Sequence, residues 1–185
     1  MSFKSTPLYG GAIQADLPTN FHDASTIRQI PDHQEVYIDS NGYSSIVIDI
    51  LEYVTKDTDE EALQYHFADL IDGTGDKTNV LEQSRADMGR TPNHPVYTLS
   101  FLQTPQSLNP RRKEPEFVAI HLLLLRLREK GTDIVITINI PHYAGEYEKA
   151  GETDGGVTPL MREGEKVAKR VLDSFEVREW GLFDA

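Results

Sequence analysis

The chain has 185 residues, of which 18 are Lys or Arg and 30 are Asp or Glu, so its formal net charge is −12. This charge repels nucleic-acid phosphates and anionic membrane surfaces and attracts basic partners, so we expect no nucleic-acid role. Cysteine is absent, which excludes disulfides, thiolate nucleophiles and sulfur-rich zinc sites. A chain of this length can bury about 70% of its unfolded surface, so we expect a single domain over residues 1–185.

The chain shows no targeting or membrane-spanning pattern. Its first residues, MSFKSTPLYGG, lack the apolar core of a signal peptide. The longest apolar run, residues 117–127, is short and is interrupted by His121 and Arg126. We therefore expect a soluble protein of the nucleus or cytoplasm with no membrane insertion.

The first third of the chain predicts two short strands and one helical turn. Residues 8–13, LYGGAI, predict an edge strand with a bulge at the paired glycines. Asp23 is a typical helix-capping residue, and Pro31 ends any helix that begins there. A further strand is expected at Gln34–Asp39, and Asn41-Gly42 after it is a strong hairpin-turn signal.

Residues 44–54, SSIVIDILEYV, are apolar at both alternating sets of positions, which predicts a strand covered on both faces. Two acids, Asp49 and Glu52, interrupt this run. They fit a helix-capping turn that begins when the strand ends at Ile48, and they fit a partner-binding surface. Side chains three residues apart on a continuous strand face opposite ways, so a shared acidic surface requires a break near Asp49. Both interpretations remain open, and they can hold together.

Two helices are predicted, one in each half of the chain. Thr58 and Glu61 form a capping box before an apolar stripe at helical spacing, and Gly73 ends that helix. Thr158-Pro159 opens a second amphipathic helix that reaches Phe175.

Three further strands are expected between and after these helices. One lies at residues 96–103, and residues 117–128 and 133–140 form the clearest hairpin of the sequence. The segments at 72–95, 104–115 and 143–157 are polar and predict loops, and VREWGLF near the end predicts a last short strand. The count is about six strands in a mostly antiparallel sheet with helices on both faces, which is an α/β/α sandwich.

The sequence contains no catalytic or metal-binding motif. Its histidines show no metal-ligand spacing, so we expect no metal and no cofactor. His66 and His121 are expected to be hydrogen-bonded residues of the core or its rim. No GxSxG motif is present, although a triad assembled only by folding stays open. The basic run Arg111–Lys113 fits a solvated loop better than a nuclear-localisation element.

Four blocks of sequence resemble the family of Ran-binding nuclear import factors: LYGGAI, DASTIRQIPDHQEVYID, IVIDILEYV and TDIVITINIP. The resemblance implies a PsbP-like α/β/α fold, binding to the small GTPase Ran and promotion of guanine nucleotide release in support of nuclear import. The family's acidic block reads IDILE here, which places Ran binding on Asp49 and Glu52. Asp23, Arg28 and Asp32 lie in the second block and are implied to border the same surface.

The resemblance therefore implies a regulatory GTPase-binding protein rather than an enzyme. Ran is the expected partner, other Ran-binding proteins remain open as partners, and a monomer is expected. The alternative is a small-molecule-binding or hydrolytic enzyme with a pocket at one end of the sheet, and a third possibility is a general trafficking adaptor. The enzyme predicts a deep apolar cavity, whereas the GTPase regulator predicts a flat acidic surface.

Overall fold

The computed structural model describes residues 1–184, which form two antiparallel sheets and two helices. Seven strands form the larger sheet in the order β3-β4-β5-β9-β8-β7-β6, and three form the smaller sheet in the order β1-β2-β10. The elements are β1 (Phe3–Leu8), β2 (Ile13–Pro18), β3 (Phe21–Asp23), β4 (Gln34–Asp39), β5 (Ser45–Glu52), α1 (Asp59–Ile71), β6 (Lys77–Ala86), β7 (Val96–Thr104), β8 (Phe117–Leu127), β9 (Thr132–His142), α2 (Pro159–Ser174) and β10 (Glu176–Val177).

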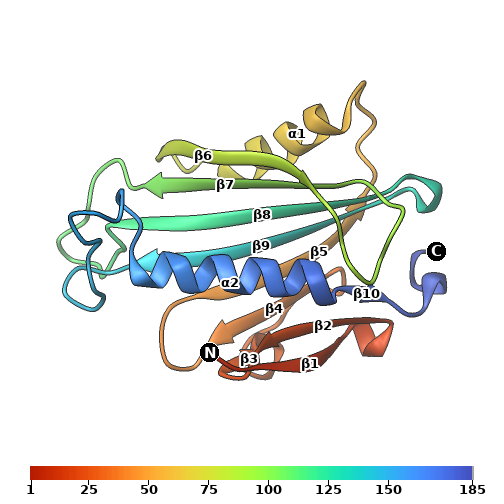
Figure 1. Cartoon of the computed structure of the whole chain (residues 1–185), viewed down its shortest axis with the longest axis horizontal. Coiled ribbons are helices and arrows are strands. Elements are labelled where there is room, and N and C mark those ends of the chain that lie inside the picture. Colours follow the sequence, from red (N-terminus) through yellow and green to blue (C-terminus); the bar gives the residue numbers. More distant parts are fainter. Residues whose placement is uncertain (185) are drawn as a thin grey trace.

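The predicted α/β/α sandwich is confirmed, because α1 and α2 lie on opposite faces of the larger sheet (Figure 1). The small sheet packs against α2 on the α2 side. The strand count is corrected from about six to seven in the main sheet, with a second sheet beside it. Within residues 1–184, neither helix is both long and apolar enough to cross a membrane.

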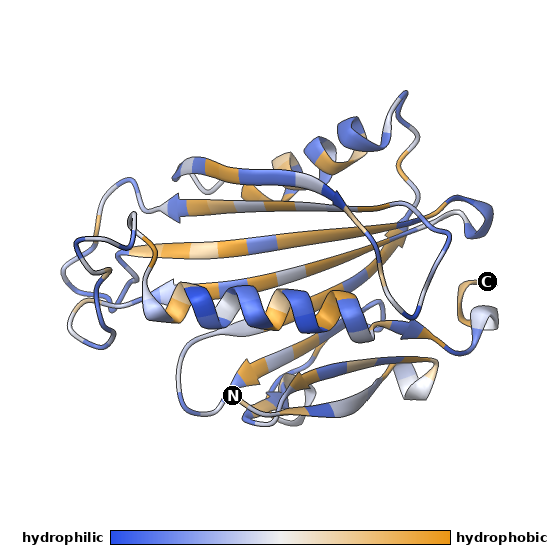
Figure 2. Ribbon diagram, in the orientation of Figure 1, coloured by the Kyte–Doolittle hydropathy of each residue, from blue (hydrophilic) through white to orange (hydrophobic). Residues whose placement is uncertain are grey.

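The hairpin of β8 and β9 forms the centre of both apolar cores. Its side chains alternate between the faces, so Leu122, Leu124 and Val135 join the α1-side core, whereas Leu123 and Ile136 join the α2-side core. In Figure 2 hydrophilic and hydrophobic segments alternate along α2, as in a helix that packs one face on the sheet. The sheet is therefore buried from both sides at its middle.

Both helices begin at the predicted capping residues. The hydroxyl oxygen of Thr58 accepts a hydrogen bond from the backbone N–H of Glu61, and that of Thr158 accepts one from Met161. The first helix ends at Ile71, before Gly73, whose φ of 70° suits glycine. These local signals depend on neighbouring residues, which explains why the sequence predicts them well.

Three sequence predictions about the sheet edges are wrong. Residues 8–13 do not form one strand, because the chain reverses through a 3-10 turn at Tyr9–Gly11 between β1 and β2. Residues 77–86 form the edge strand β6, which the sequence did not predict because most of its side chains are exposed and polar. The last expected strand is only Glu176–Val177, and a 3-10 turn follows at Trp180–Phe183.

Candidate functional site

The strand β5 runs without interruption from Ser45 to Glu52, so the predicted break near Asp49 is wrong. Asp49 pairs with Val135 of β9 and Glu52 pairs with Thr132, in one continuous register. Because the two acids are three positions apart on a continuous strand, they face opposite sides of the sheet and lie about 10 Å apart along the strand. They do not form the single acidic patch that the interpretation as a shared partner-binding surface required, and Asp49 does not cap a turn, because β5 continues past it.

Asp49 is half-buried on the face of the sheet that carries α1. Its Oδ1 accepts a hydrogen bond of 2.8 Å from the side-chain amide of Gln34, its cross-strand neighbour on β4. Burial raises the pKa of the Asp49 carboxyl above its usual range, and the Gln34 hydrogen bond and the charge of His33 act in the opposite direction. The hydrogen bond from Gln34 therefore restricts the orientation of the Asp49 carboxyl group.

Glu35, the residue after Gln34 on β4, is a second acid and faces the opposite side of the sheet from Asp49. The carboxylate of Glu35 accepts a 2.7 Å hydrogen bond from the backbone N–H of Tyr9, and the Tyr9 hydroxyl donates to the carbonyl oxygen of Ile48 at 2.7 Å. Burial raises the pKa of the Glu35 carboxyl, as does the charge of Asp23, whereas the Tyr9 N–H lowers it. Through these two hydrogen bonds, the Tyr9–Gly11 turn between β1 and β2 contacts both β4 and β5.

Asp23 and Asp32 line one small polar hollow of about 190 Å³ together with Gln34. Asp23 caps the 3-10 turn that follows it, as predicted, and accepts a 2.8 Å hydrogen bond from the backbone N–H of Ser25. Gln34 connects this hollow to Asp49 through its side-chain amide. The hollow and Asp49 thus share Gln34 as a neighbour, while Arg28 is exposed on the adjoining loop.

Glu52 is exposed at the last position of β5. It faces the α2 side of the sheet, as do Ile46, Ile48 and Ile50. The chain beyond it stays attached to the sheet, since the backbone N–H of Tyr53 donates to the carbonyl oxygen of Gly131 at 2.9 Å. Glu52 is therefore presented to solvent from a backbone that is held in place.

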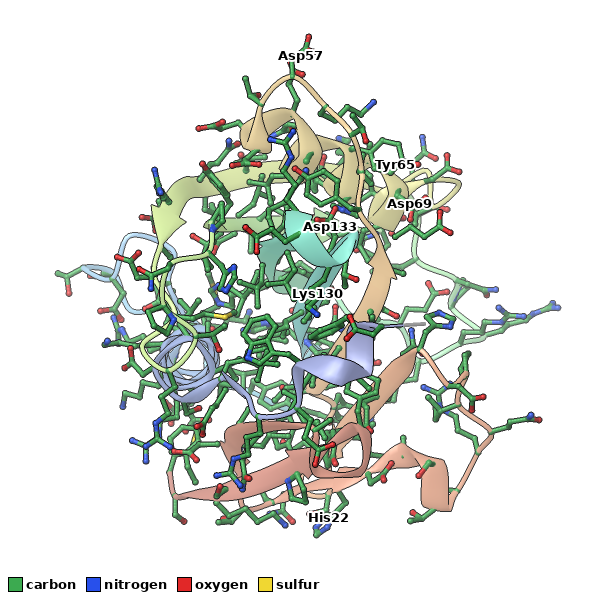
Figure 3. All side chains as sticks on the ribbon, turned by 90° about the vertical axis from the view of Figure 1, so that its right-hand side faces the viewer. His22, Asp57, Tyr65, Asp69, Lys130 and Asp133 are labelled. Atoms are coloured by element: carbon green, nitrogen blue, oxygen red, sulfur yellow. The ribbon has the colours of Figure 1, made fainter. Side chains whose placement is uncertain are left out.

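A buried ionic cluster fixes the chain that follows Glu52. Arg126 and Asp133 form an ion pair, and Asp133 Oδ2 also lies 2.8 Å from Nε2 of His66 on α1. Arg126 donates to the carbonyl oxygen of Val54 at 2.8 Å, and its guanidinium carbon lies 3.9 Å from the centre of the Tyr53 ring. Figure 3 looks onto this end of the molecule, with Asp133 in the interior near its centre.

The sequence analysis does not predict that His66, Arg126 and Asp133 form one cluster. It treated Arg126 as an interruption of an apolar run, and it did not single out Asp133. The expectation of a hydrogen-bonded core histidine is confirmed for His66, and His121 also bonds Ser100 at 2.8 Å. The sequence does offer one signal, since Arg126 and Asp133 each lie in an apolar run that predicts a strand. A charged side chain that is buried in such a strand needs a partner of opposite charge.

The larger hollows lie away from Asp49. One groove of about 530 Å³ separates α2 from β6, β7 and β8, and its floor includes the Ser100–His121 pair. Another hollow of about 520 Å³ lies at the end of the sheet, where Leu127 and Trp180 line it. The described residues 1–184 contain no group of three His, Asp or Glu side chains suited to holding a metal ion.

Comparisons with known proteins place this geometry among Ran-related proteins. A family model described as Ran-interacting Mog1 protein matches residues 6–141. The chain is 35% identical over 186 residues to the Ran guanine nucleotide release factor of Danio rerio, covering 97% of this chain and 99% of that protein. It is 33% identical over 169 residues to the nuclear import protein MOG1 of Saccharomyces cerevisiae, covering 83% of this chain and 73% of that protein.

Solved structures give the same grouping. The crystal structure of the Saccharomyces cerevisiae Ran-binding protein Mog1p has a TM-score of 0.77 and 31% identity, and the match covers 99% of each chain. The Mycobacterium tuberculosis protein LpqN has a TM-score of 0.51 at 14% identity, covering 95% of this chain and 91% of that one, so this likeness concerns the fold alone. The fold is the PsbP-like sandwich that the sequence resemblance implied.

Proposed function

Because this chain belongs to the family of Ran-interacting Mog1 proteins, we propose that it binds the small GTPase Ran and promotes guanine nucleotide release from it. A Ran-related role in nuclear import is supported by relatives named Ran guanine nucleotide release factor and nuclear import protein. The observation that carries the proposal is the family match over residues 6–141, which spans the whole of β5 with Asp49 and Glu52.

Glu52 is the proposed direct contact with Ran. Its carboxylate is exposed, and the ionic cluster behind it holds the strand end in place. A carboxylate that is already positioned loses less conformational entropy when it pairs with a basic side chain of a partner. The net charge of −12 adds a long-range attraction that speeds encounter with a basic surface.

Asp49 is proposed to act from the opposite face of the sheet, together with the hollow that contains Asp23 and Asp32. Arg28 on the adjoining loop is proposed to border this area. Since Asp49 and Glu52 face opposite ways, a partner that contacts both must reach around the end of β5 rather than lie flat on one face. This geometry replaces the flat acidic surface expected from the sequence.

Release of nucleotide needs no bond chemistry from this chain. A release factor binds the nucleotide-free GTPase more tightly than the loaded form, and linkage then requires nucleotide to weaken the factor's binding by the same factor. A coupling free energy of about 1–3 kcal/mol corresponds to roughly a 5- to 150-fold change in nucleotide affinity. We propose a regulator that acts as a monomer in the nucleus and cytoplasm, with other Ran-binding proteins as further partners.

The test is the binding of purified Ran to the wild-type chain and to Glu52→Lys, measured by calorimetry with nucleotide-free and GDP-loaded Ran. We expect tighter binding to the nucleotide-free form and loss of binding in the variant. Equal affinity of the wild-type chain for both forms of Ran would refute the release mechanism. An unchanged affinity in Glu52→Lys would remove Glu52 from the proposed interface.

A further inference from the structure

A hollow of about 520 Å³ opens at the end of the sheet that carries the β8–β9 turn. Leu127, Pro95 and Trp180 supply apolar surface to it, and the indole of Trp180 lies 5.2 Å from the ring of His94. Residues 128–130 at the β8–β9 turn supply charges of both signs to the lining. The hollow thus combines an aromatic and aliphatic lining with polar neighbours.

The strand register places this hollow on the same side as Glu52. Glu52 pairs with Thr132 of β9, and Thr132 pairs on its other side with Leu127 of β8. Directly paired residues point to the same face, and Leu127 belongs to the α2-side core. Since adjacent strands lie about 5 Å apart, the backbones of Glu52 and Leu127 are about 10 Å from each other.

We propose that this hollow receives an apolar side chain, aromatic or long aliphatic, from the same partner that Glu52 contacts. This inference rests on the proposed function and names a second anchor of its interface. Protein interfaces concentrate their binding energy in a few buried anchors, among which Trp is enriched, with polar residues around them. An apolar hollow beside an exposed carboxylate provides both parts within the reach of one partner.

The C-terminal segment forms one wall of the hollow. Trp180 opens the 3-10 turn Trp180–Phe183, and the carboxylate of Asp184 lies 2.7 Å from the ammonium of Lys130 on the opposite wall. Figure 3 shows Lys130 at the centre of this end of the molecule. This partly exposed ion pair connects the C-terminal wall to the β8–β9 turn.

The experiment compares the affinity of purified Ran for the full chain and for variants with different effects on the hollow. Trp180→Ala removes its aromatic wall, and His94→Trp fills it from the side without removing a buried side chain. Glu52→Lys tests the neighbouring carboxylate. Tyr43→Ala is the matched control, because Tyr43 is an exposed aromatic residue just before β5, near the end of the strand opposite to Glu52. Thermal unfolding of each variant reports the fold.

We expect Trp180→Ala and His94→Trp each to weaken Ran binding at least about tenfold, and Tyr43→Ala to bind as wild type. Trp180→Ala is also expected to lower the unfolding temperature, because Trp180 packs against the α2-side core, so His94→Trp is the variant that separates loss of the hollow from loss of stability. If Glu52→Lys loses binding while both hollow variants stay within about twofold of wild type, the hollow is not part of the interface and the proposed function stands. Normal binding by all variants would remove both Glu52 and the hollow from the interface and overturn the inference, whereas absence of Ran binding by the wild-type chain would refute the proposed function. A dimer of the wild-type chain that Trp180→Ala abolishes would assign the hollow to a second copy and overturn the inference.

Discussion

Nε of Arg126 lies 3.2 Å from Oδ1 of Asp133, and the two side chains are only 2% and 0% exposed. The pair joins the end of β8 to the start of β9. Each member also holds Val54, since Arg126 donates to its carbonyl oxygen and Asp133 accepts from its N–H at 3.1 Å. Interior charges therefore fix the backbone just beyond Glu52, the residue proposed to meet Ran.

Replacing Arg126 by Met is expected to destabilise the chain strongly. The substitution leaves the buried carboxylate of Asp133 without its cation, and breaking a buried pair in this way costs about 3–5 kcal/mol. Urea unfolding measures the loss. Lys169→Met is the control, because Lys169 forms an exposed pair with Asp173 whose contribution is at most about 0.5 kcal/mol. Equal losses in the two variants would show that the buried pair does not hold this end together.

Glu52→Gln is expected to weaken Ran binding at least about tenfold without changing stability, because the variant keeps the shape of the side chain and removes its charge. The effect should shrink as salt rises, since exposed charges are screened. Titration calorimetry at two salt concentrations measures both effects. Glu163→Gln on the exposed face of α2 serves as the control. If both variants bind alike, net charge rather than the position of Glu52 matters.

Asp49→Asn is expected to gain stability relative to wild type as the pH rises. The pKa of Asp49 is raised in the folded chain, so the unfolded chain releases this proton first and the carboxyl's contribution to stability is lost as the pH climbs through the folded pKa. Asparagine has no such loss and can still accept the hydrogen bond from Gln34. Urea unfolding at about pH 3 and about pH 7 gives the comparison. A stability difference that stays constant or reverses would contradict the assigned burial effect.

Gly164→Ala is expected to destabilise the chain although alanine favours helix. A Cβ at this position would lie 2.8 Å from Cγ1 of Ile140, so α2 could no longer pack as closely on β9. Overpacking costs about 1–3 kcal/mol, which outweighs or cancels the gain in helix propensity of about 1 kcal/mol. Gly181→Ala is the control because nothing lies within 4 Å of its added Cβ. Thermal unfolding that ranks the Gly164 variant above wild type would refute the close packing.

The sequence predicted those parts of the fold that depend on local or strongly periodic signals. The caps at Thr58 and Thr158 and the β8–β9 hairpin are of this kind. It failed at β6, because an exposed edge strand needs no alternation of apolar residues. It also failed at Tyr9–Gly11, where the reversal is completed by contacts with Glu35 and Ile48, which are distant in sequence.

The candidate site was predicted only in part for a similar reason. Asp49 and Glu52 are acids within an apolar run, yet the sequence alone does not decide whether the strand ends at Ile48 or continues through Asp49. Pairing of β5 with β9 keeps the strand continuous as far as Glu52. The cluster of His66, Arg126 and Asp133 assembles from three elements, so no single stretch of sequence reveals it.

The most direct measurement is the release of a fluorescent GTP analogue from purified Ran, followed with and without this chain. We expect the wild-type chain to accelerate release in a concentration-dependent manner, and Glu52→Lys at the same concentration to leave the rate near that of Ran alone. A release rate that the wild-type chain does not change, at concentrations where binding to Ran is saturated, would contradict the proposed function.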